Sequence, residues 1–214
     1  MKIFNSLTGK KETFRSKINE EVSIYICGLT PYDDVHIGHA RTFVNFDVIV
    51  KFFKFLGFKV RYVRNITDVD DKIINRAKEE GIPALDLSKK YIKEMHDDFS
   101  SLGIESPDVE PKVSDHIDEI ISMIQSLEEK GYAYRKKESD VFFDVQKFKE
   151  YGKLSNRSLE QLTAAERTIV DLNKKHKADF VLWKVDTDGI TWPSPWGKGR
   201  PGWHIECYAM RIKY

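Results

Sequence analysis

The sequence has little of several features that mark whole classes of protein. Its 214 residues include only two cysteines, and Lys and Arg number 35 against 34 Asp and Glu, so neither sign of charge dominates. No apolar run approaches the roughly 20 residues that a membrane-spanning helix needs. These features argue against a disulfide scaffold, a membrane protein and a generally basic nucleic-acid binder. The first residues lack a basic segment followed by an apolar one, so we expect no secretion signal and a cytoplasmic location.

What the chain does contain is the pattern of an α/β protein with a substantial core. A β-rich run over 22–26 is followed by apolar residues at helical spacing over 38–56 and by an alternating run over 59–64. Strand, helix and strand in this order predict a βαβ unit with a parallel sheet and a nucleotide-binding function. Further elements are expected as helices over 70–80 and 84–102, a helix from about 115 to Gly131, a strand over 180–184 and a helix over 203–213.

The chain changes character after residue 130. A hairpin-like pair of short apolar runs is followed there by a polar stretch rich in Lys, Arg and Asn. We interpret 131–185 as a connective insertion between the first half of a catalytic domain, over 1–130, and the start of its second half, over 186–214. The dozen residues from Trp192 to Trp203 hold three prolines, three glycines and three tryptophans, which predict a rigid loop where backbone can approach a ligand.

The segment from Cys27 to Arg41 carries most of the candidate chemistry. It combines a strand end, a glycine turn, a helix start and two histidines three positions apart. Backbone N–H groups at a helix start attract phosphate, and His36 and His39 would lie on one face where both reach the same anion. Gly38 between them allows close approach. Two other readings stay open at this point, because such histidines can also cap a helix or bind a metal.

The run His36-Ile37-Gly38-His39 after a strand resembles the signature of class I aminoacyl-tRNA synthetases. In that family the two histidines help bind ATP and stabilise the charge that develops on its α-phosphate, a form of preorganised electrostatic catalysis. The resemblance implies a catalytic role for His36 and His39, with Mg²⁺ accompanying ATP. It places ATP binding in the loop of Leu29, Thr30, Pro31, Tyr32, Asp33, Asp34, Val35, His36, Ile37, Gly38 and His39.

Further segments narrow the resemblance to the cysteinyl-tRNA synthetases. The runs over 2–8, 25–28, 62–73, 179–184 and 199–207 are similar to that family in order and spacing, and together they span most of the chain. The implied fold is a Rossmann-like parallel sheet with an inserted connective segment, incomplete at the C-terminus. The implied reaction is ATP-dependent activation of L-cysteine to cysteinyl-adenylate and transfer to tRNA(Cys), by a monomer.

The resemblance also implies a metal site and a substrate pocket. Cys27 and Cys207 match two of four protein ligands of a zinc ion that binds the substrate thiolate. His204 and Glu206 flank Cys207, but in the family the other two ligands lie in a His-His-Glu-Asn-Glu segment, which this sequence does not contain. The residues expected to contact the cysteine are Gly28, Thr30, Thr67 and Trp203.

Zinc suits a site that must distinguish cysteine from serine. An ordinary pocket gains only about 1–3 kcal/mol from differences as small as one heavy atom. A thiol with an unperturbed pKa of ~8.5 is deprotonated on the metal, whereas a hydroxyl is a much poorer ligand. Selection of the thiol without a separate editing site is therefore expected.

Three features keep alternatives open. The family's mobile lysine loop and its helical tRNA domain are not in the sequence, so we expect these 214 residues alone to be inactive or badly impaired. A truncated, non-catalytic binding module is one alternative. Pro31 departs from the typical synthetase and resembles a cysteine ligase of mycothiol synthesis, the second alternative.

The acidic residues could bind Mg²⁺, but we interpret them as helix caps and ion-pair partners: Asp33, Asp34, Asp68, Asp70 and Asp71.

Overall fold

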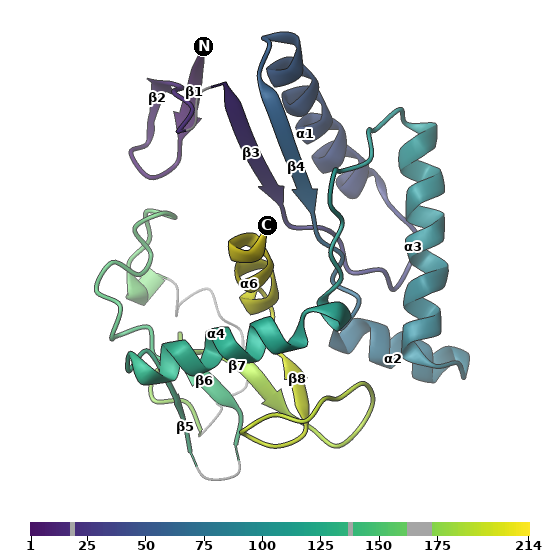
Figure 1. The fold of residues 1–214 in the computed structure, drawn as a ribbon. Coiled ribbons are helices and arrows are strands. Elements are labelled where there is room, and N and C mark those ends of the chain that lie inside the picture. The colour runs from purple at the N-terminus through teal and green to yellow at the C-terminus, as the bar shows by residue number, and fades with distance from the viewer. Residues whose placement is uncertain (18–19, 137–138, 162–172) are drawn as a thin grey trace.

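The computed structural model describes residues 1–17, 20–136, 139–161 and 173–214 (Figure 1). Its elements in chain order are β1 (Lys2–Asn5), β2 (Lys10–Thr13), β3 (Glu21–Ile26), α1 (Ile37–Phe55), β4 (Lys59–Arg64), α2 (Asp71–Glu80), α3 (Ala84–Ser101), a 3₁₀ turn (Val113–Asp115), α4 (Ile117–Glu129), β5 (Ala133–Arg135), β6 (Val141–Phe143), β7 (Phe180–Val185), β8 (Gly199–Pro201) and α6 (Ile205–Lys213).

The predicted βαβ unit is present. β3 and β4 pair in parallel, with Glu21 opposite Lys59 and Ile26 opposite Arg64, and α1 forms the crossover between them. The helix ends before Gly57, whose φ of +86° is the left-handed conformation that glycine adopts most readily. Because the strands are parallel, both end at the same edge of the sheet, as the two arrowheads in Figure 1 show. The expected α/β fold is confirmed.

The core of this unit lies between the sheet and two helices. Phe43 and Val50 of α1 and Phe99 of α3 are buried together with Ile26 and Tyr62 of the sheet. The helical spacing in the sequence predicted the helix but only part of its buried side, because Ile49, Phe52 and Leu56 of the apolar pattern are exposed. Burial of the large side chains that do face the core contributes roughly 1.5–3 kcal/mol each. The unit is therefore held by apolar packing that leaves the strand ends open for other residues.

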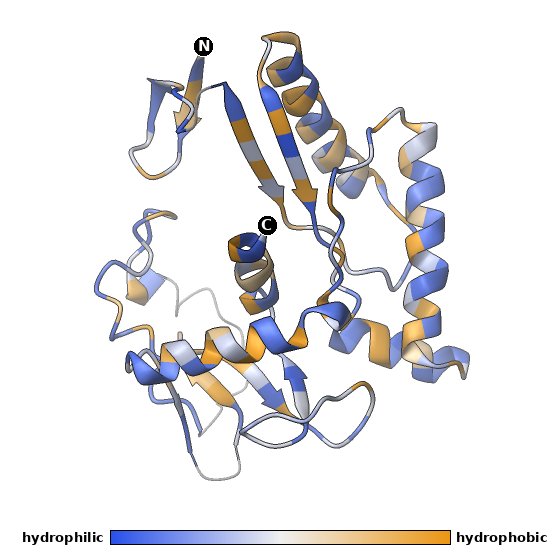
Figure 2. Cartoon of the chain, in the orientation of Figure 1, coloured by the Kyte–Doolittle hydropathy of each residue, from blue (hydrophilic) through white to orange (hydrophobic). Residues whose placement is uncertain are grey.

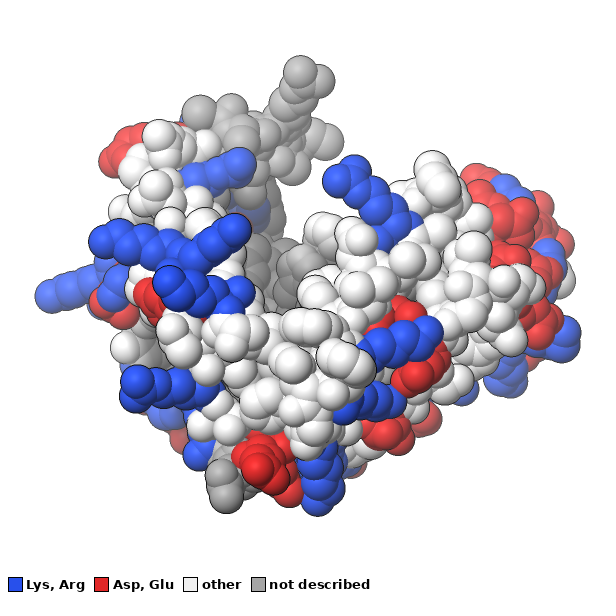
Figure 3. All heavy atoms as spheres, turned by 90° about the horizontal axis from the view of Figure 1, so that it is seen from above, with Lys and Arg blue, Asp and Glu red and all other residues white. Residues whose placement is uncertain are grey.

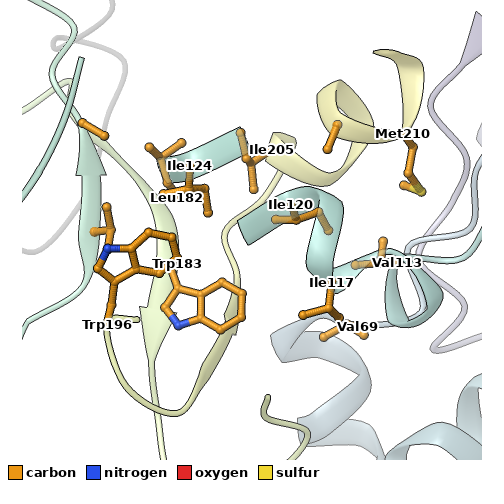
Figure 4. Close-up of a cluster of buried hydrophobic side chains, with 13 residues drawn as sticks. Val69, Val113, Ile117, Ile120, Ile124, Leu182, Trp183, Trp196, Ile205 and Met210 are labelled. Carbon is orange, nitrogen blue, oxygen red and sulfur yellow. The ribbon is translucent and has the colours of Figure 1, made fainter. Parts of the chain in front are cut away.

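A second sheet forms the other part of the molecule. Its four antiparallel strands lie in the order β5-β6-β7-β8, and α4 and α6 pack against it. Polar and apolar residues alternate along α4 in Figure 2, and the buried ones recur every three or four positions at Ile117, Ile120 and Ile124. Figure 4 shows these isoleucines in one buried cluster with Trp183 and Trp196, whose ring centroids lie 5.9 Å apart.

Two elements of the fold differ from what the pattern indicated. The segment from 192 to 203, expected to be a loop, contains the short strand β8, which pairs with β7 so that Pro201 lies opposite Trp183. The three residues of β8 are too few to show a strand pattern, and they form a strand because they pair with β7. The hairpin of β1 and β2 was not expected either, because its side chains are largely exposed and show no apolar alternation.

Ion pairs join the two parts of the molecule. The carboxylate of Asp71, at the start of α2, accepts hydrogen bonds from Nε and Nη2 of Arg200 at 3.1 and 2.5 Å and from Nζ of Lys184 at 2.8 Å. These cations lower the pKa of Asp71 against the raising effect of its burial. Asp70 caps α2 by accepting from the backbone N–H of Lys72 at 2.8 Å. The interpretation of these two acids as cap and ion-pair partner is confirmed.

The surface carries charge of both signs. On the face drawn in Figure 3, Lys and Arg gather on the left, whereas acidic and basic residues lie side by side on the right, in keeping with a formal net charge of +1. Within the ranges that the structure describes, no helix combines the length and the apolar character needed to cross a membrane. The division of the chain at 130 and 185 stays a prediction.

Candidate active site

Residues from three distant parts of the sequence meet where β3 and β4 end. Cys27 and Gly28 follow β3, Asn65 and Thr67 follow β4, and Cys207 lies in the first turn of α6. Ligands of open α/β sheets bind at the carboxyl ends of parallel strands, because the loops that leave this edge are free to converge. The candidate residues therefore lie at the edge where an open parallel sheet binds its ligands.

Asn65 holds this arrangement together. Its Oδ1 accepts hydrogen bonds from the hydroxyl of Tyr25 at 3.1 Å, from the backbone N–H of Gly28 at 3.1 Å and from Sγ of Cys207 at 3.5 Å. Its Nδ2 donates to Oγ1 of Thr67 at 3.2 Å. Asn65 is completely buried, so these partners satisfy an amide that would otherwise lose its hydrogen bonds with water. The sequence offered no signal for this role beyond the position of Asn65 just after a strand.

Two thiols and an imidazole form a cluster at this edge. One ligand atom each from Cys27, His204 and Cys207 lies within 4.8 Å of the other two. Hydrogen bonds from Cys207 and then from His204 lower the pKa of the Cys27 thiol to about 5. The same contact with Cys27, together with burial, raises the pKa of Cys207, and the hydrogen bond to Cys27 raises the pKa of His204. The cluster therefore favours the thiolate of Cys27.

This donor set fits zinc. Thiolate sulfur and imidazole nitrogen are the ligands that zinc takes most often in proteins, and a catalytic site keeps a further position for substrate. The cysteine pair that the sequence predicted is brought together. The sequence analysis did not favour His204 as a ligand, but in the structure it lies close enough to both thiols to be a third donor. It does so because it precedes α6 in a left-handed conformation with φ of +77°. That turn could not be foreseen, since only a few per cent of non-glycine residues adopt a positive φ.

A cavity of about 250 Å³ lies next to this cluster, and Thr67, Trp203 and Glu206 are among the residues that line it. Two of the four predicted pocket residues, Thr67 and Trp203, are thus brought to one cavity, whereas Gly28 and Thr30 do not line it. The Trp203 side chain is largely exposed and stacks on His204, with ring centroids 4.3 Å apart. Glu206 is buried, which raises its pKa to about 7, and its Oε2 has no hydrogen-bond partner among the described residues.

The histidines of the loop cap α1 through their Nδ1 atoms. Nδ1 of His36 accepts from the backbone N–H of Gly38 at 3.1 Å, and Nδ1 of His39 accepts from the backbone N–H of His36 at 3.4 Å. When both Nδ1 atoms accept, the proton of each neutral ring lies on Nε2. The rings stack with centroids 3.8 Å apart. Two Nε2–H donors therefore lie side by side at a helix start, an arrangement that suits an anion.

The other residues of this loop divide between the core and the surface. Leu29 and Pro31 are buried, and Tyr32 and Val35 are half-buried against apolar clusters. By contrast, Asp33, Asp34 and Ile37 are exposed, Thr30 is half-buried and Gly38 is exposed between the histidines. The loop is thus anchored by its apolar members, which leave its polar members accessible at the edge of the sheet.

The role of Asn65 gives a direct prediction. Asn65→Ala leaves the N–H of Gly28 and the hydroxyl of Tyr25 without their acceptor, and each buried group left unpaired costs about 1–3 kcal/mol. We expect a loss of roughly 3 kcal/mol in the free energy of unfolding, measured by urea denaturation. Asn5→Ala in the exposed β1–β2 hairpin is the control, and it should change stability by less than about 0.5 kcal/mol. Equal losses for the two variants would contradict the role of Asn65.

Comparison with known proteins shows the family of the chain. Residues 13–214 match the family described as tRNA synthetases class I (C) catalytic domain. The chain is 53% identical over 213 residues to the cysteine–tRNA ligase of Idiomarina loihiensis and 54% identical over 214 residues to that of Pasteurella multocida. These alignments cover 99% and 100% of the chain, but only 46% and 47% of the relatives, so it spans about half of their length.

A solved structure supports the fold independently. The methionyl-tRNA synthetase of Mycobacterium tuberculosis, in complex with methionyl-adenylate, matches 58% of this chain and 25% of its own with a TM-score of 0.50. Its sequence identity of 20% makes this a likeness of fold alone. Because the family model matches almost the whole chain, the chain belongs to the class I tRNA synthetase (C) catalytic domain family.

Proposed function

We propose that this chain supplies the ATP-binding and cysteine-binding part of a cysteine–tRNA ligase. The substrates are ATP, L-cysteine and tRNA(Cys), and the products of the two steps are cysteinyl-adenylate and cysteinyl-tRNA. The observation that carries the proposal is the thiol and imidazole cluster of Cys27, His204 and Cys207, beside a cavity lined by Thr67 and Trp203. The names of the relatives support the same reaction.

Selection of cysteine rests on the thiol cluster. Cys27 and Cys207 hold zinc in this proposal, with His204 as a third donor within reach. When bound, zinc would act as a Lewis acid that lowers the pKa of the substrate thiol and favours the thiolate over a serine hydroxyl. Asn65 fixes Cys207 and the turn at Gly28, while Trp203 and Thr67 border the space for the amino acid.

Activation of cysteine rests on the histidine loop. A carboxylate oxygen of cysteine attacks the α-phosphorus of ATP, the bond to the β-phosphate oxygen breaks, and pyrophosphate leaves. The Nε2–H groups of His36 and His39 donate hydrogen bonds to the phosphate oxygens on which negative charge grows. Mg²⁺ is expected to accompany ATP. In the second step a hydroxyl at the tRNA 3′ end attacks the adenylate carbonyl carbon, and AMP leaves.

Several finer statements belong to the same proposal. The catalytic and binding roles of the residues named above, the monomeric state and the cytoplasmic location stay predictions. The same holds for the expected impairment of the 214 residues on their own. The test of the proposal is therefore a measurement of substrate recognition, which does not depend on turnover.

The test uses cobalt as a spectroscopic replacement for zinc. Cobalt with thiolate ligands shows sulfur-to-metal charge-transfer absorption, so its spectrum reports each added sulfur. We expect that L-cysteine changes the spectrum of the cobalt-loaded chain and that L-serine at the same concentration leaves it unchanged, because only the thiolate is a strong ligand. Cysteine methyl ester serves as a second ligand that keeps the thiol and loses the carboxylate.

The outcomes separate the proposal from its alternatives. A spectrum that does not respond to L-cysteine would contradict thiol recognition at this site. A response to cysteine that is abolished by Trp203→Ala but kept by Trp192→Ala, a half-buried tryptophan outside the cavity, would support the cavity as the amino acid site. A direct ligation assay compares tRNA and an amino sugar as acceptors of activated cysteine. Acceptance of the amino sugar in place of tRNA would favour a cysteine ligase of mycothiol synthesis.

A further inference from the structure

The first turn of α2 places a cation beside the histidine loop. Lys72 is the second residue of α2, and its Nζ lies 5.2 Å from the centroid of the Tyr32 ring. Tyr32 belongs to the loop that leads to His36, and it packs against a buried apolar cluster formed by α2 and α3. A cation over an aromatic face is held by the electrostatic attraction of the ring. Tyr32 therefore keeps the ammonium group of Lys72 close to this loop.

In the part of the chain that the structure describes, no carboxylate pairs with the charge of Lys72. Its neighbour Asp71 is paired with Lys184 and Arg200, and further along the same helix Arg76 is paired with Glu80. Lys72 is exposed, and no described residue forms an ion pair with it. Its ammonium group has three N–H donors, and it is free to bind an anion at this edge of the sheet.

His39 supplies a hydrogen-bond donor but little charge. Burial, the neighbouring His36 and Lys72 all lower the pKa of His39, in that order of importance, so the His39 ring is neutral at pH 7. A neutral imidazole still donates a hydrogen bond, but hydrogen bonds between charged partners are roughly twice as strong. A nearby cation would therefore strengthen the binding of a triphosphate at this loop. Lys72 is close enough for its charge to act on the His39 ring, since it contributes to the lowered pKa of His39.

We propose that Lys72 is a phosphate-binding residue for the nucleotide at the histidine loop, acting from a different helix than His36 and His39. The proposal rests on the proposed function, since it needs ATP at this loop. The loops after β3 and β4 leave the same edge of the sheet in Figure 1, and they lead to the starts of α1 and α2. Lys72 and the two histidines thus approach one region from two sides.

The experiment measures nucleotide binding to the 214-residue chain by isothermal titration calorimetry with Mg²⁺ present. Lys72→Met is expected to weaken ATP binding about 10-fold, because a charge-assisted contact to phosphate is lost, and to leave adenosine binding unchanged. Lys72→Arg keeps the charge and should stay within about 3-fold of the original chain. The control is Lys78→Met, which removes an exposed lysine in the last turn of the same helix and should change neither affinity.

Each outcome decides the proposal. An unchanged ATP affinity for Lys72→Met, with weaker binding for the His36→Asn and His39→Asn double variant, would overturn the role of Lys72 and leave the histidine site in place. Equal losses for Lys72→Met and Lys78→Met would also overturn it, because the effect would then be one of net charge. A chain that binds neither ATP nor adenosine, while its circular dichroism shows a folded protein, would overturn both this proposal and the nucleotide site itself.

Discussion

Cys27→Ser combined with Cys207→Ser is expected to abolish zinc binding. The two thiols are the only cysteines of the sequence, and with His204 they form the cluster of donors at the strand ends. Changes to outer partners of metal ligands typically cost 10–100-fold in affinity, so removing two thiolate ligands should cost roughly a thousandfold or more. Elemental analysis after dialysis should fall from about one zinc per chain to nearly none.

The matched control removes a histidine far from the cluster. His96 lies on the exposed side of α3 and contacts Glu110, so His96→Asn should keep a full equivalent of zinc. The single variant His204→Asn should weaken zinc binding less than the loss of both thiols, because imidazole is the third donor of the cluster. Retention of one tightly bound zinc by the double cysteine variant would show that the metal lies elsewhere.

Gly28→Ala is expected to destabilise the protein severely. A Cβ atom at Gly28 would lie 1.6 Å from the backbone oxygen of Asn65 and 2.7 Å from its carbonyl carbon. These are backbone atoms that follow β4, so neither can move without breaking the parallel pairing that places the site. We expect a loss of roughly 4 kcal/mol or more, at the upper end of single substitutions. For a chain of this size that loss lowers the melting temperature by about 10–15 °C, measured by calorimetry.

The control for this variant is a glycine in open space. Gly103 has φ of +68° and no atom within 4 Å of an added Cβ, so Gly103→Ala tests the cost of the backbone conformation alone. That cost is about 1–2 kcal/mol. If Gly28→Ala melted at the same temperature as Gly103→Ala, the close contact between the two strand ends would not be as tight as described. The comparison thus isolates the contact from the general effect of replacing glycine.

Local patterns were sufficient for most of the elements. Apolar residues at helical spacing predicted α1 at 38–56, and the structure has it at Ile37–Phe55, since a helix brings residues three and four positions apart to one side. The short strand β8 and the hairpin of β1 and β2 could not be predicted in this way. Their residues show no period, and β8 is a strand because it pairs with β7.

The sequence by itself determined the α/β class, the parallel βαβ unit and the family, because each depends on residues close together in the chain. Only the tertiary structure decided how the candidate site is assembled. Asn65 joins Cys207 to the turn at Gly28, and the left-handed turn before α6 brings His204 to the two thiols. Asn65 and Gly28 are 37 positions apart and Asn65 and Cys207 are 142 apart, so no local preference encodes these contacts. They follow from the packing of α6 beside the ends of two parallel strands.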